Sequence, residues 1–311
     1  MKDKIVMIFG GSGTFGTAMT KKIQDDAKQI IHFDRDEKNQ YISKQLNHND
    51  KIVRVVGDIR DKEAVDNVIA TYNPDVIMLA SAMKHIDKCE AFPDECRKTN
   101  IDGCINVINS AISHDVDKLV FLSTDKATSP TTIYGCSKLF VEMYIQSVDS
   151  RNTTLLTTRY GNVLGSNGSV LDIWKRQRDN GEALTVTNPD MTRFFMSIGQ
   201  AVDLVLYALE NGSNKDLWVY NNKACTIKDL ADCISDNQIE VGLRCVEKND
   251  EALLTVNELD HSQYVVDNNG NLVYHVYNKN NYKFWNFDKP FRSDNAERFT
   301  KEELMELISE I

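Results

Sequence analysis

The stretch Gly10-Gly-Ser-Gly-Thr-Phe-Gly16 stands between an apolar run, 5–9, and a segment with helical spacing of its apolar residues, 14–27. Glycine permits positive φ in a tight turn and lets backbone N–H groups approach an anion, and the positive end of the following helix faces the same place. A glycine run alone is a weak signal, but this position between strand and helix is typical of the turn that holds a dinucleotide pyrophosphate. The contacts expected from this turn come from Gly10, Ser12, Gly13, Thr14, Phe15 and Gly16.

Apolar runs with the length of buried strands alternate with helix-like stretches through the first half of the chain. Alternation of this kind predicts βαβ units, and therefore an α/β fold with a Rossmann-type, doubly wound parallel sheet. We expect strands at 5–9, 30–33, 52–56, 76–80, 119–122 and 155–158, and helices at 14–27, 37–46, 62–72, 94–114 and 134–148.

The second half of the chain has weaker periodicity. We expect residues 1–160 to form an NAD(P)-binding Rossmann domain. Residues 161–311 are expected to form a smaller, mainly substrate-binding region, with some segments returning to the Rossmann domain. The alternative is that its polar segments are ordinary surface loops. Asn, Gly and Asp crowd the segments 161–168, 211–216, 236–242 and 267–281.

The composition of the 311 residues excludes several classes of function. A net charge of −10 argues against nucleic acid as the main partner. No apolar run approaches the roughly 18 residues of a membrane span, and the first run leads into the glycine turn instead of a cleavage site. The seven Cys are dispersed without a C-x-x-C pair, which favours reduced thiols in a cytoplasmic protein and gives no metal site.

The residues after the second expected strand give opposing signals about the cofactor. An acid such as Asp34 usually binds the ribose hydroxyls of NAD, whereas a nearby Arg35 accommodates the 2′-phosphate of NADP. Lys38 offers a second phosphate contact, and a solvated charged turn would have the same composition. Further cofactor contacts are expected where the third and fourth strands end, from Asp58, Ile59, Ala80, Ser81 and Ala82.

Tyr134 and Lys138 form a Y-x-x-x-K pair in an expected helix. Residues four apart share one face of a helix, and a lysine ammonium beside a tyrosine favours the phenolate. Such a tyrosine can take the proton of a sugar hydroxyl while hydride leaves the same carbon. Many helices carry this pair by chance, but here it follows both the glycine turn and the fifth expected strand.

The segment Ser123-Thr-Asp-Lys-Ala127, together with the glycine turn and the tyrosine–lysine pair, resembles the extended short-chain dehydrogenases/reductases. It is most similar to the C5-inverting UDP-N-acetylglucosamine 4,6-dehydratases of polysaccharide and pseudaminic acid biosynthesis, whereas retaining dehydratases carry Ser-Thr-Asp-Glu here. The resemblance covers nearly the whole chain. Further similar segments begin at Ala82, Lys98, Thr158, Gly168, Met191, Gly242 and Arg292.

This resemblance implies a reaction in three stages. Tyr134, tuned by Lys138 and next to Thr124, takes the C4 hydroxyl proton while hydride passes to the nicotinamide. Lys126 then removes the C5 proton and Asp125 helps the C6 hydroxyl leave as water. Finally hydride returns to C6 and C5 is reprotonated. The alternative for Asp125 and Lys126 is a solvent-facing ion pair at the end of a strand.

The resemblance also implies tighter binding of NADP than of NAD, a UDP-N-acetylglucosamine substrate and a homo-oligomer, dimer or hexamer. The chain departs from the family pattern at Asp34, Asn167 and 245–251, which leaves the sugar less certain than the reaction. A retaining dehydratase, an epimerase and a non-catalytic NADP-binding sensor are the alternatives. Lys84 and Val163 are further expected cofactor contacts, and Lys84, Thr99, Asn162, Ser169, Arg193, Arg244 and Glu247 are expected substrate contacts.

Overall fold

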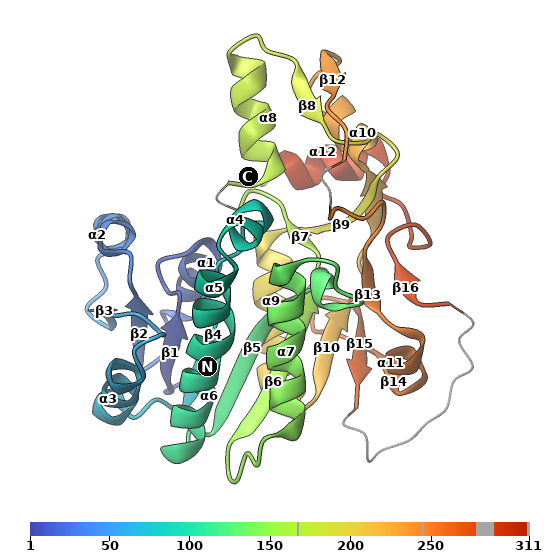
Figure 1. The fold of residues 1–311 in the computed structure, drawn as a ribbon. Coiled ribbons are helices and arrows are strands. Elements are labelled where there is room, and N and C mark those ends of the chain that lie inside the picture. The colour runs from blue at the N-terminus through green and yellow to red at the C-terminus, as the bar shows by residue number, and fades with distance from the viewer. Residues whose placement is uncertain (167, 244–245, 278–288, 310–311) are drawn as a thin grey trace.

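The computed structural model describes residues 1–166, 168–243, 246–277 and 289–309. Its centre is a nine-stranded sheet in the order β14-β15-β10-β6-β5-β4-β1-β2-β3 (Figure 1). The first-half strands are all parallel to one another, so their carboxyl ends lie along one edge. They are β1 (Ile5–Phe9), β2 (Gln29–Asp34), β3 (Ile52–Val56), β4 (Val76–Leu79), β5 (Lys118–Thr124) and β6 (Thr154–Tyr160).

Three strands from the second half extend this sheet. β10 (Leu217–Tyr220) pairs with β6 in parallel. β15 (Leu272–Val276) pairs with β10, and β14 (Ser262–Val266) with β15, both antiparallel. The sheet therefore contains strands from both sides of residue 160, while the expected boundary between two domains at that residue stays a prediction.

Helices cover both faces of the sheet, because alternate strand residues are apolar and point to opposite sides. In β1, Val6 and Ile8 join one core with residues of α1 (Thr14–Ile23) and α9 (Ile198–Asn211). Met7 and Phe9 join the other core. Its covering helices are α3 (Lys62–Tyr72), α6 (Cys104–Ser113) and α7 (Ile133–Ser147), while α2 (Glu37–Leu46) follows β2. The predicted doubly wound α/β fold is confirmed.

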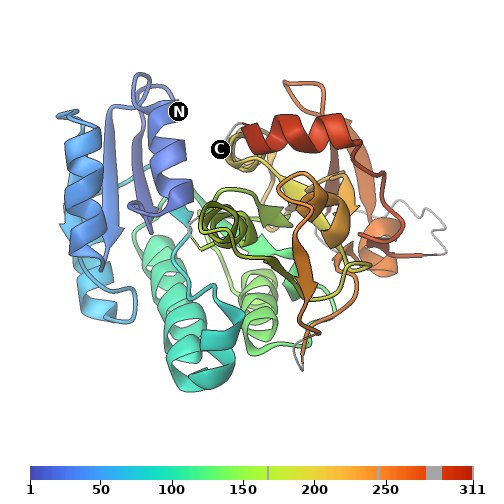
Figure 2. The same cartoon turned by 90° about the horizontal axis from the view of Figure 1, so that it is seen from above.

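The rest of the second half packs beside the sheet, and its orange and red elements lie on one side of the molecule in Figure 2. A separate core around Trp174 and Leu230 holds much of it together. The helices of this part of the chain are α8 (Val170–Asp179), α10 (Ile227–Asp232), α11 (Val256–Asp260) and α12 (Lys301–Ser309). The strands of this part are β7 (Asn162–Val163), β8 (Leu184–Val186), β9 (Thr192–Met196), β11 (Ala224–Thr226), β12 (Gln238–Glu240), β13 (Ala252–Leu254) and β16 (Phe291–Arg292).

Two expected helices differ clearly from the observed structure. The expected helix 94–114 is divided into α5 (Pro93–Arg97), a π-helical segment η1 (Lys98–Gly103) and α6. Within η1 the Asn100 amide donates to the Met83 carbonyl at 2.9 Å and accepts from the Met83 N–H at 2.8 Å. A π-helical turn of this kind is frequent at functional sites. The short helix α4 (Ile86–Ala91) was not expected, and α1 ends at Ile23 instead of 27.

No helix in the described ranges is both long enough and apolar enough to span a membrane.

Candidate active site

A cavity of about 660 Å³ lies at the carboxyl edge of the parallel strands. Ligands of doubly wound folds bind at this edge. A second cavity of about 570 Å³ lies at the opposite edge, where Lys4 and Lys22 are already paired with carboxylates. The larger cavity is the candidate site. Of the residues predicted from sequence, its lining includes Gly10, Gly13, Thr14, Phe15, Asp34, Arg35, Asp58, Ile59, Ala80, Ser81, Ala82, Lys84, Thr99, Thr124, Lys126, Tyr134, Lys138, Asn162 and Val163.

The glycine turn between β1 and α1 has no space for side chains. Gly10 has φ +88°, and a Cβ there would lie 3.0 Å from the Ser81 nitrogen. A Cβ on Gly16 would lie 2.5 Å from the backbone of Gly11. The turn therefore brings the start of α1 close to the ends of β1 and β4. This leaves a side-chain-free cradle at a helix N-terminus, which fits a dinucleotide pyrophosphate.

The end of β2 presents a fixed carboxylate to the cavity. Asp34 Oδ2 accepts hydrogen bonds from the Ser12 hydroxyl at 2.5 Å and the Ser12 N–H at 3.3 Å. Arg35 pairs with Asp58 at 3.5 Å. Lys38 is not among the residues that line the cavity. Ser12 thus contributes to the site through Asp34, and the charge nearest the ribose position is negative.

Tyr134 and Lys138 both line the cavity from α7. Lys138 is buried, and its Nζ donates to the Leu122 carbonyl at 2.8 Å. Burial lowers the pKa of Lys138. Burial also raises the pKa of Tyr134, and a hydrogen bond with Thr124 acts in the opposite direction. The pair therefore has the buried setting in which small changes of nearby charge alter protonation.

Helix α7 lies unusually close to the loop that precedes it. The Thr132 hydroxyl caps the helix by accepting from the Gly135 N–H at 3.0 Å. A Cβ on Gly135 would lie 2.2 Å from the Lys126 carbonyl oxygen. Glycine at this position therefore allows the first turn of α7, with Tyr134, to pack directly against Lys126.

The segment Thr124-Asp-Lys126 turns at the end of β5 in a short 3₁₀ helix, η2 (Asp125–Ala127). Lys126 Nζ donates to Asp125 Oδ1 at 3.0 Å and to Asn162 Oδ1 at 3.4 Å. The side chains of Asp125 and Lys126 are 0% and 15% exposed. The alternative of a solvent-facing ion pair is therefore wrong.

Asp125 is buried next to the cavity, on the far side of its contact with Lys126. It lies behind Lys126 and is not among the residues that line the cavity. Its Oδ1 also accepts from the Thr124 hydroxyl at 2.8 Å. Its Oδ2 has no hydrogen-bond partner among the described residues. The arrangement lets Asp125 orient Lys126 and Thr124, whereas its direct contact with a leaving hydroxyl stays a prediction.

The substrate side of the cavity holds Thr99, Asn162 and Lys84. The Thr99 hydroxyl, in η1, is buried without a hydrogen-bond partner among the described residues. A buried hydroxyl of this kind is expected to find a partner in a ligand or a water. Burial lowers the pKa of Lys84, and Asp172 acts in the opposite direction.

Three of the remaining predicted substrate residues, Ser169, Arg193 and Glu247, are not in the described cavity lining. Arg193 is buried in β9 and donates to the carbonyl oxygens of Thr192, Lys248 and Asn249 at 2.7–3.1 Å. This geometry shows that Arg193 holds the backbone of these residues, and its expected diphosphate contact stays a prediction. Arg244 lies outside the described residues. Ser169, Glu247 and the turn residue Gly16 are not in the cavity lining.

The sequence interpretation missed several lining residues. Tyr160 and Gly161 directly precede Asn162 in a segment that the resemblance includes, and His85 and Lys88 follow Lys84. His85 also packs beneath Gly168, where a Cβ would lie 2.9 Å from the imidazole Cε1. The signal for these residues was their position within motifs already identified.

Known proteins with similar sequences share this arrangement of elements. A family described as polysaccharide biosynthesis protein matches residues 6–269. A Rickettsia conorii protein named UDP-glucose 4-epimerase is 37% identical, over 98% of this chain and 95% of its own. The solved structure of Pen from Bacillus thuringiensis is 32% identical, with a TM-score of 0.90, over 100% of this chain and 99% of its own.

A more distant solved structure shows the same fold. The dTDP-glucose 4,6-dehydratase DesIV from Streptomyces venezuelae, solved with NAD bound, is 17% identical with a TM-score of 0.72. The match covers 78% of this chain and 86% of that protein. At this identity the likeness concerns the fold alone.

Proposed function

The chain belongs to the polysaccharide biosynthesis protein family, among the nucleotide-sugar epimerases and dehydratases of the short-chain dehydrogenase/reductase superfamily. From this premise we propose that it is a nucleotide-sugar 4,6-dehydratase that inverts C5. The proposed substrate is UDP-N-acetylglucosamine, and the product is a UDP-2-acetamido-2,6-dideoxy-4-keto-L-hexose of β-L-arabino configuration. The proposed setting is polysaccharide biosynthesis of the pseudaminic acid type.

The observation that carries the proposal is the position of Lys126. Its amine lines the same cavity as Tyr134 and Lys138 and is held between Asp125 and Asn162. An epimerase or a simple oxidoreductase needs the tyrosine and the lysine of α7 but has no use for a second amine at this place. A dehydratase needs a base for the proton at C5, and Lys126 supplies one.

The cavity fits a nicotinamide dinucleotide. The side-chain-free turn at Gly10 accommodates the pyrophosphate, and Asp34 lies where the adenosine ribose binds in this fold. When bound, the nicotinamide would accept hydride from C4 of the sugar and return it to C6, so that no external reductant would be consumed.

Tyr134 acts in the first step by taking the proton of the C4 hydroxyl. Burial raises its pKa, so the phenol is protonated until a positive charge stabilises the phenolate. The Lys138 ammonium and a cationic ligand ring are the charges available for this. The hydrogen bond between Lys138 and the Leu122 carbonyl fixes that ammonium below the cavity floor.

Lys126 acts in the second step by removing the C5 proton. Base action requires a neutral amine, and Lys126 Nζ lies 3.0 Å from Asp125 Oδ1. We propose that Asp125 Oδ1, already 3.0 Å from Nζ, takes the excess proton when substrate fills the cavity. Asp125 Oδ2 has no hydrogen-bond partner among the described residues.

The ribose end of the cavity bears on the choice between NAD and NADP. The expectation of tighter NADP binding rested on Arg35, on Lys38 and on the family resemblance. In the structure Arg35 is paired with Asp58, and Lys38 does not line the cavity. Asp34, held in place by Ser12, would repel a 2′-phosphate. The proposal supported by these contacts is therefore NAD(H) in preference to NADP(H).

A nucleotide-sugar 4-epimerase is the second candidate function, because relatives at 37% identity carry that name. Incubation with UDP-N-acetylglucosamine followed by mass spectrometry separates the two. Dehydration lowers the product mass by one water, whereas epimerisation leaves it unchanged. A product of unchanged mass would replace the dehydratase proposal with the epimerase. A retaining dehydratase would also lose water and requires the stereochemical test given below.

A further inference from the structure

Arg159 is a buried guanidinium held between two carboxylates. It lies in β6, and its side chain is 2% exposed. Its Nε and Nη2 donate to Glu142 at 3.1 and 2.5 Å, and its Nη1 and Nη2 donate to Glu258 at 3.1 and 2.9 Å. Only the planar fork of an arginine can bind two carboxylates in this way. The network therefore joins α7, β6 and α11 through one side chain.

One side of this network reaches the catalytic groups. Glu142 follows Lys138 by one turn and Tyr134 by two turns on the same face of α7. The Ser123 hydroxyl donates to Glu142 Oε1, and Ser123 directly precedes Thr124. Movement of Glu142 would therefore shift both the end of β5 and the helix that carries the tyrosine–lysine pair.

The other side reaches a segment of the second half, 246–258. The Leu253 carbonyl accepts from Arg159 Nη1 at 2.8 Å and from the Thr128 hydroxyl at 3.3 Å. Thr128 lies in the loop between η2, which contains Lys126, and α7. Glu258 also accepts from the Thr255 N–H, as the third residue of a capping box that begins α11.

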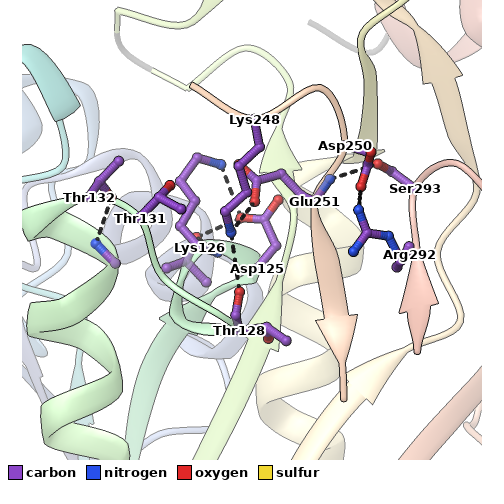
Figure 3. Close-up of polar contacts among 12 residues, drawn as sticks. Asp125, Lys126, Thr128, Thr131, Thr132, Lys248, Asp250, Glu251, Arg292 and Ser293 are labelled. Atoms are coloured by element: carbon purple, nitrogen blue, oxygen red, sulfur yellow. Dashed lines mark hydrogen bonds and ion pairs between the residues drawn. The ribbon is translucent and has the colours of Figure 1, made fainter. Parts of the chain in front are cut away.

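Further contacts hold the same segment against the same loop (Figure 3). Lys248 Nζ donates to the Thr128 carbonyl and to Glu251, both at 3.3 Å. The Thr131 hydroxyl donates to the Val246 carbonyl at 3.1 Å. Arg193 holds the Lys248 carbonyl from the opposite side at 2.7 Å. The loop that connects the two catalytic elements is thus bonded to segment 246–258 at several points.

We propose that Arg159 is a positioning residue that fixes the catalytic loop 123–134 and helix α7 relative to segment 246–258. The catalytic loop and the first turns of α7 then keep one position against this segment during the several steps of the reaction. A displacement of about 1 Å in such a site lowers turnover by as much as about a hundredfold. The inference rests on the proposed function for the reaction that is assayed, whereas the contacts themselves do not depend on it.

Glu258→Gln is the variant that tests this role with least risk to folding. Arg159, Glu142 and Glu258 together carry a net charge of −1. Replacing Glu258 by glutamine therefore leaves Arg159 paired with Glu142 and creates no unpaired buried charge. Glutamine also serves as the third residue of a capping box. Asp229→Asn is the matched control, because Asp229 is the third residue of the capping box that begins α10 and lies outside this network.

Two measurements are made on each cofactor-bound protein. In amide hydrogen exchange, Glu258→Gln should accelerate exchange in 123–138, and Asp229→Asn should not. In the dehydration assay, kcat per cofactor-binding site should fall about tenfold or more while the KM for UDP-N-acetylglucosamine changes by less than about threefold. Arg159→Lys, which keeps the charge but loses the fork, should show the same pattern.

If Arg159 only stabilised the fold, fewer molecules of each variant would fold and bind the cofactor. The kcat per cofactor-binding site would then be unchanged. The inference is overturned if faster exchange is confined to residues 252–262, or if kcat per site of both variants stays within about twofold of the original protein. If the original protein does not dehydrate the sugar, the proposed function fails, and the exchange measurement still decides the role of Arg159.

Discussion

At the scale of single residues, the site depends on side chains whose partners decide their chemistry. Lys126 and Asp125 illustrate this, because the amine proposed as the base is held 3.0 Å from the Asp125 carboxylate. Asp34 is a second case, since the Ser12 hydroxyl and N–H hold its charge in one place. His32 is a third, behind the glycine turn. Each gives a prediction that a single substitution can test.

Lys126→Ala should bind the cofactor normally, because the glycine turn and Lys138 are unchanged. Its rate of water elimination should fall by about 10²–10⁴-fold, the usual contribution of a general base. Cofactor titration and the mass-spectrometric assay measure the two properties. Lys228→Ala is the control, since this exposed lysine pairs only with Asp232 on its own helix among the contacts described for it. Near-normal dehydration by Lys126→Ala would remove Lys126 from the mechanism.

Asp34→Ser should shift cofactor preference toward NADP(H). It removes a negative charge from the ribose end, and an interaction of one unit charge with another 4 Å away is worth about 4 kcal/mol near a protein surface. The ratio of NADPH to NADH affinity should therefore rise by about tenfold or more. Asp36→Ser, which removes the same charge from the cap of α2, should change the ratio less. An unchanged ratio in Asp34→Ser would show that Asp34 does not face the cofactor phosphate.

His32 predicts a pH dependence of stability. The Thr20 hydroxyl donates to the Gly16 carbonyl at 2.7 Å, so its oxygen accepts from His32 Nε2–H at 2.7 Å. The Nδ1 atom has no partner among the described residues, and burial lowers the pKa of His32 to about 4. The unfolded chain therefore takes up this proton first. The free energy of unfolding should fall by about 3 kcal/mol as the pH drops from 6.5 to 4.

Urea denaturation across that pH range measures this effect. His32→Gln should lose the part of the pH dependence that comes from His32, whereas His48→Gln, at an exposed position, should keep it. Equal pH dependence in both variants would mean that His32 is not neutral in the folded state.

At the scale of elements, the first helix turn of α7 sets the distance between Tyr134 and Lys126. Gly135→Ala should separate them, because the added Cβ would lie 2.2 Å from the Lys126 carbonyl. The strain, about 1–3 kcal/mol, exceeds the helix propensity of about 0.8–1.0 kcal/mol that alanine gains.

Unfolding and dehydration assays on Gly135→Ala should therefore both show a loss. Gly199→Ala is the matched control in the first turn of α9, where the nearest atom to a new Cβ, Ser197 Oγ, is 3.5 Å away. It should stabilise the protein. A Gly135→Ala variant as stable and active as the original would show that α7 tolerates displacement.

Some helices and strands could be predicted from the sequence, and others could not. β1, β3, α2 and α3 were predicted with their observed bounds, because their apolar pattern and caps are local. β10, β14 and β15 were not predicted, because each is a short strand whose partner lies far away in the chain.

The candidate site follows the same rule. Tyr134 and Lys138 share one helix face, and Lys126 directly follows a strand, so local pattern placed them in the cavity. Arg193 was expected at the diphosphate, but its partners, 55 and 56 residues away, are the carbonyls of Lys248 and Asn249. Such a contact has no signal in the local sequence.

At the scale of the whole molecule, the sheet brings the two halves of the chain to one cavity. The carboxyl ends of β1 to β6 supply the cofactor side, and the short strand β7 after β6 supplies Asn162 and Val163. Segment 246–258 then holds the catalytic loop through Arg159 and Lys248. Assembly as a dimer or hexamer and the division into two domains at residue 160 stay predictions.

The central claim is that this cavity removes water from a nucleotide sugar and inverts C5. Proton NMR of a reaction with UDP-N-acetylglucosamine in deuterated water tests it most directly. The account predicts a 4-keto-6-deoxy sugar with deuterium at C5, inverted C5 couplings and no accumulation of reduced cofactor. Retained C5 configuration would return the assignment to the retaining dehydratases, and a product epimerised at C4 with its C6 hydroxyl intact would contradict dehydration altogether.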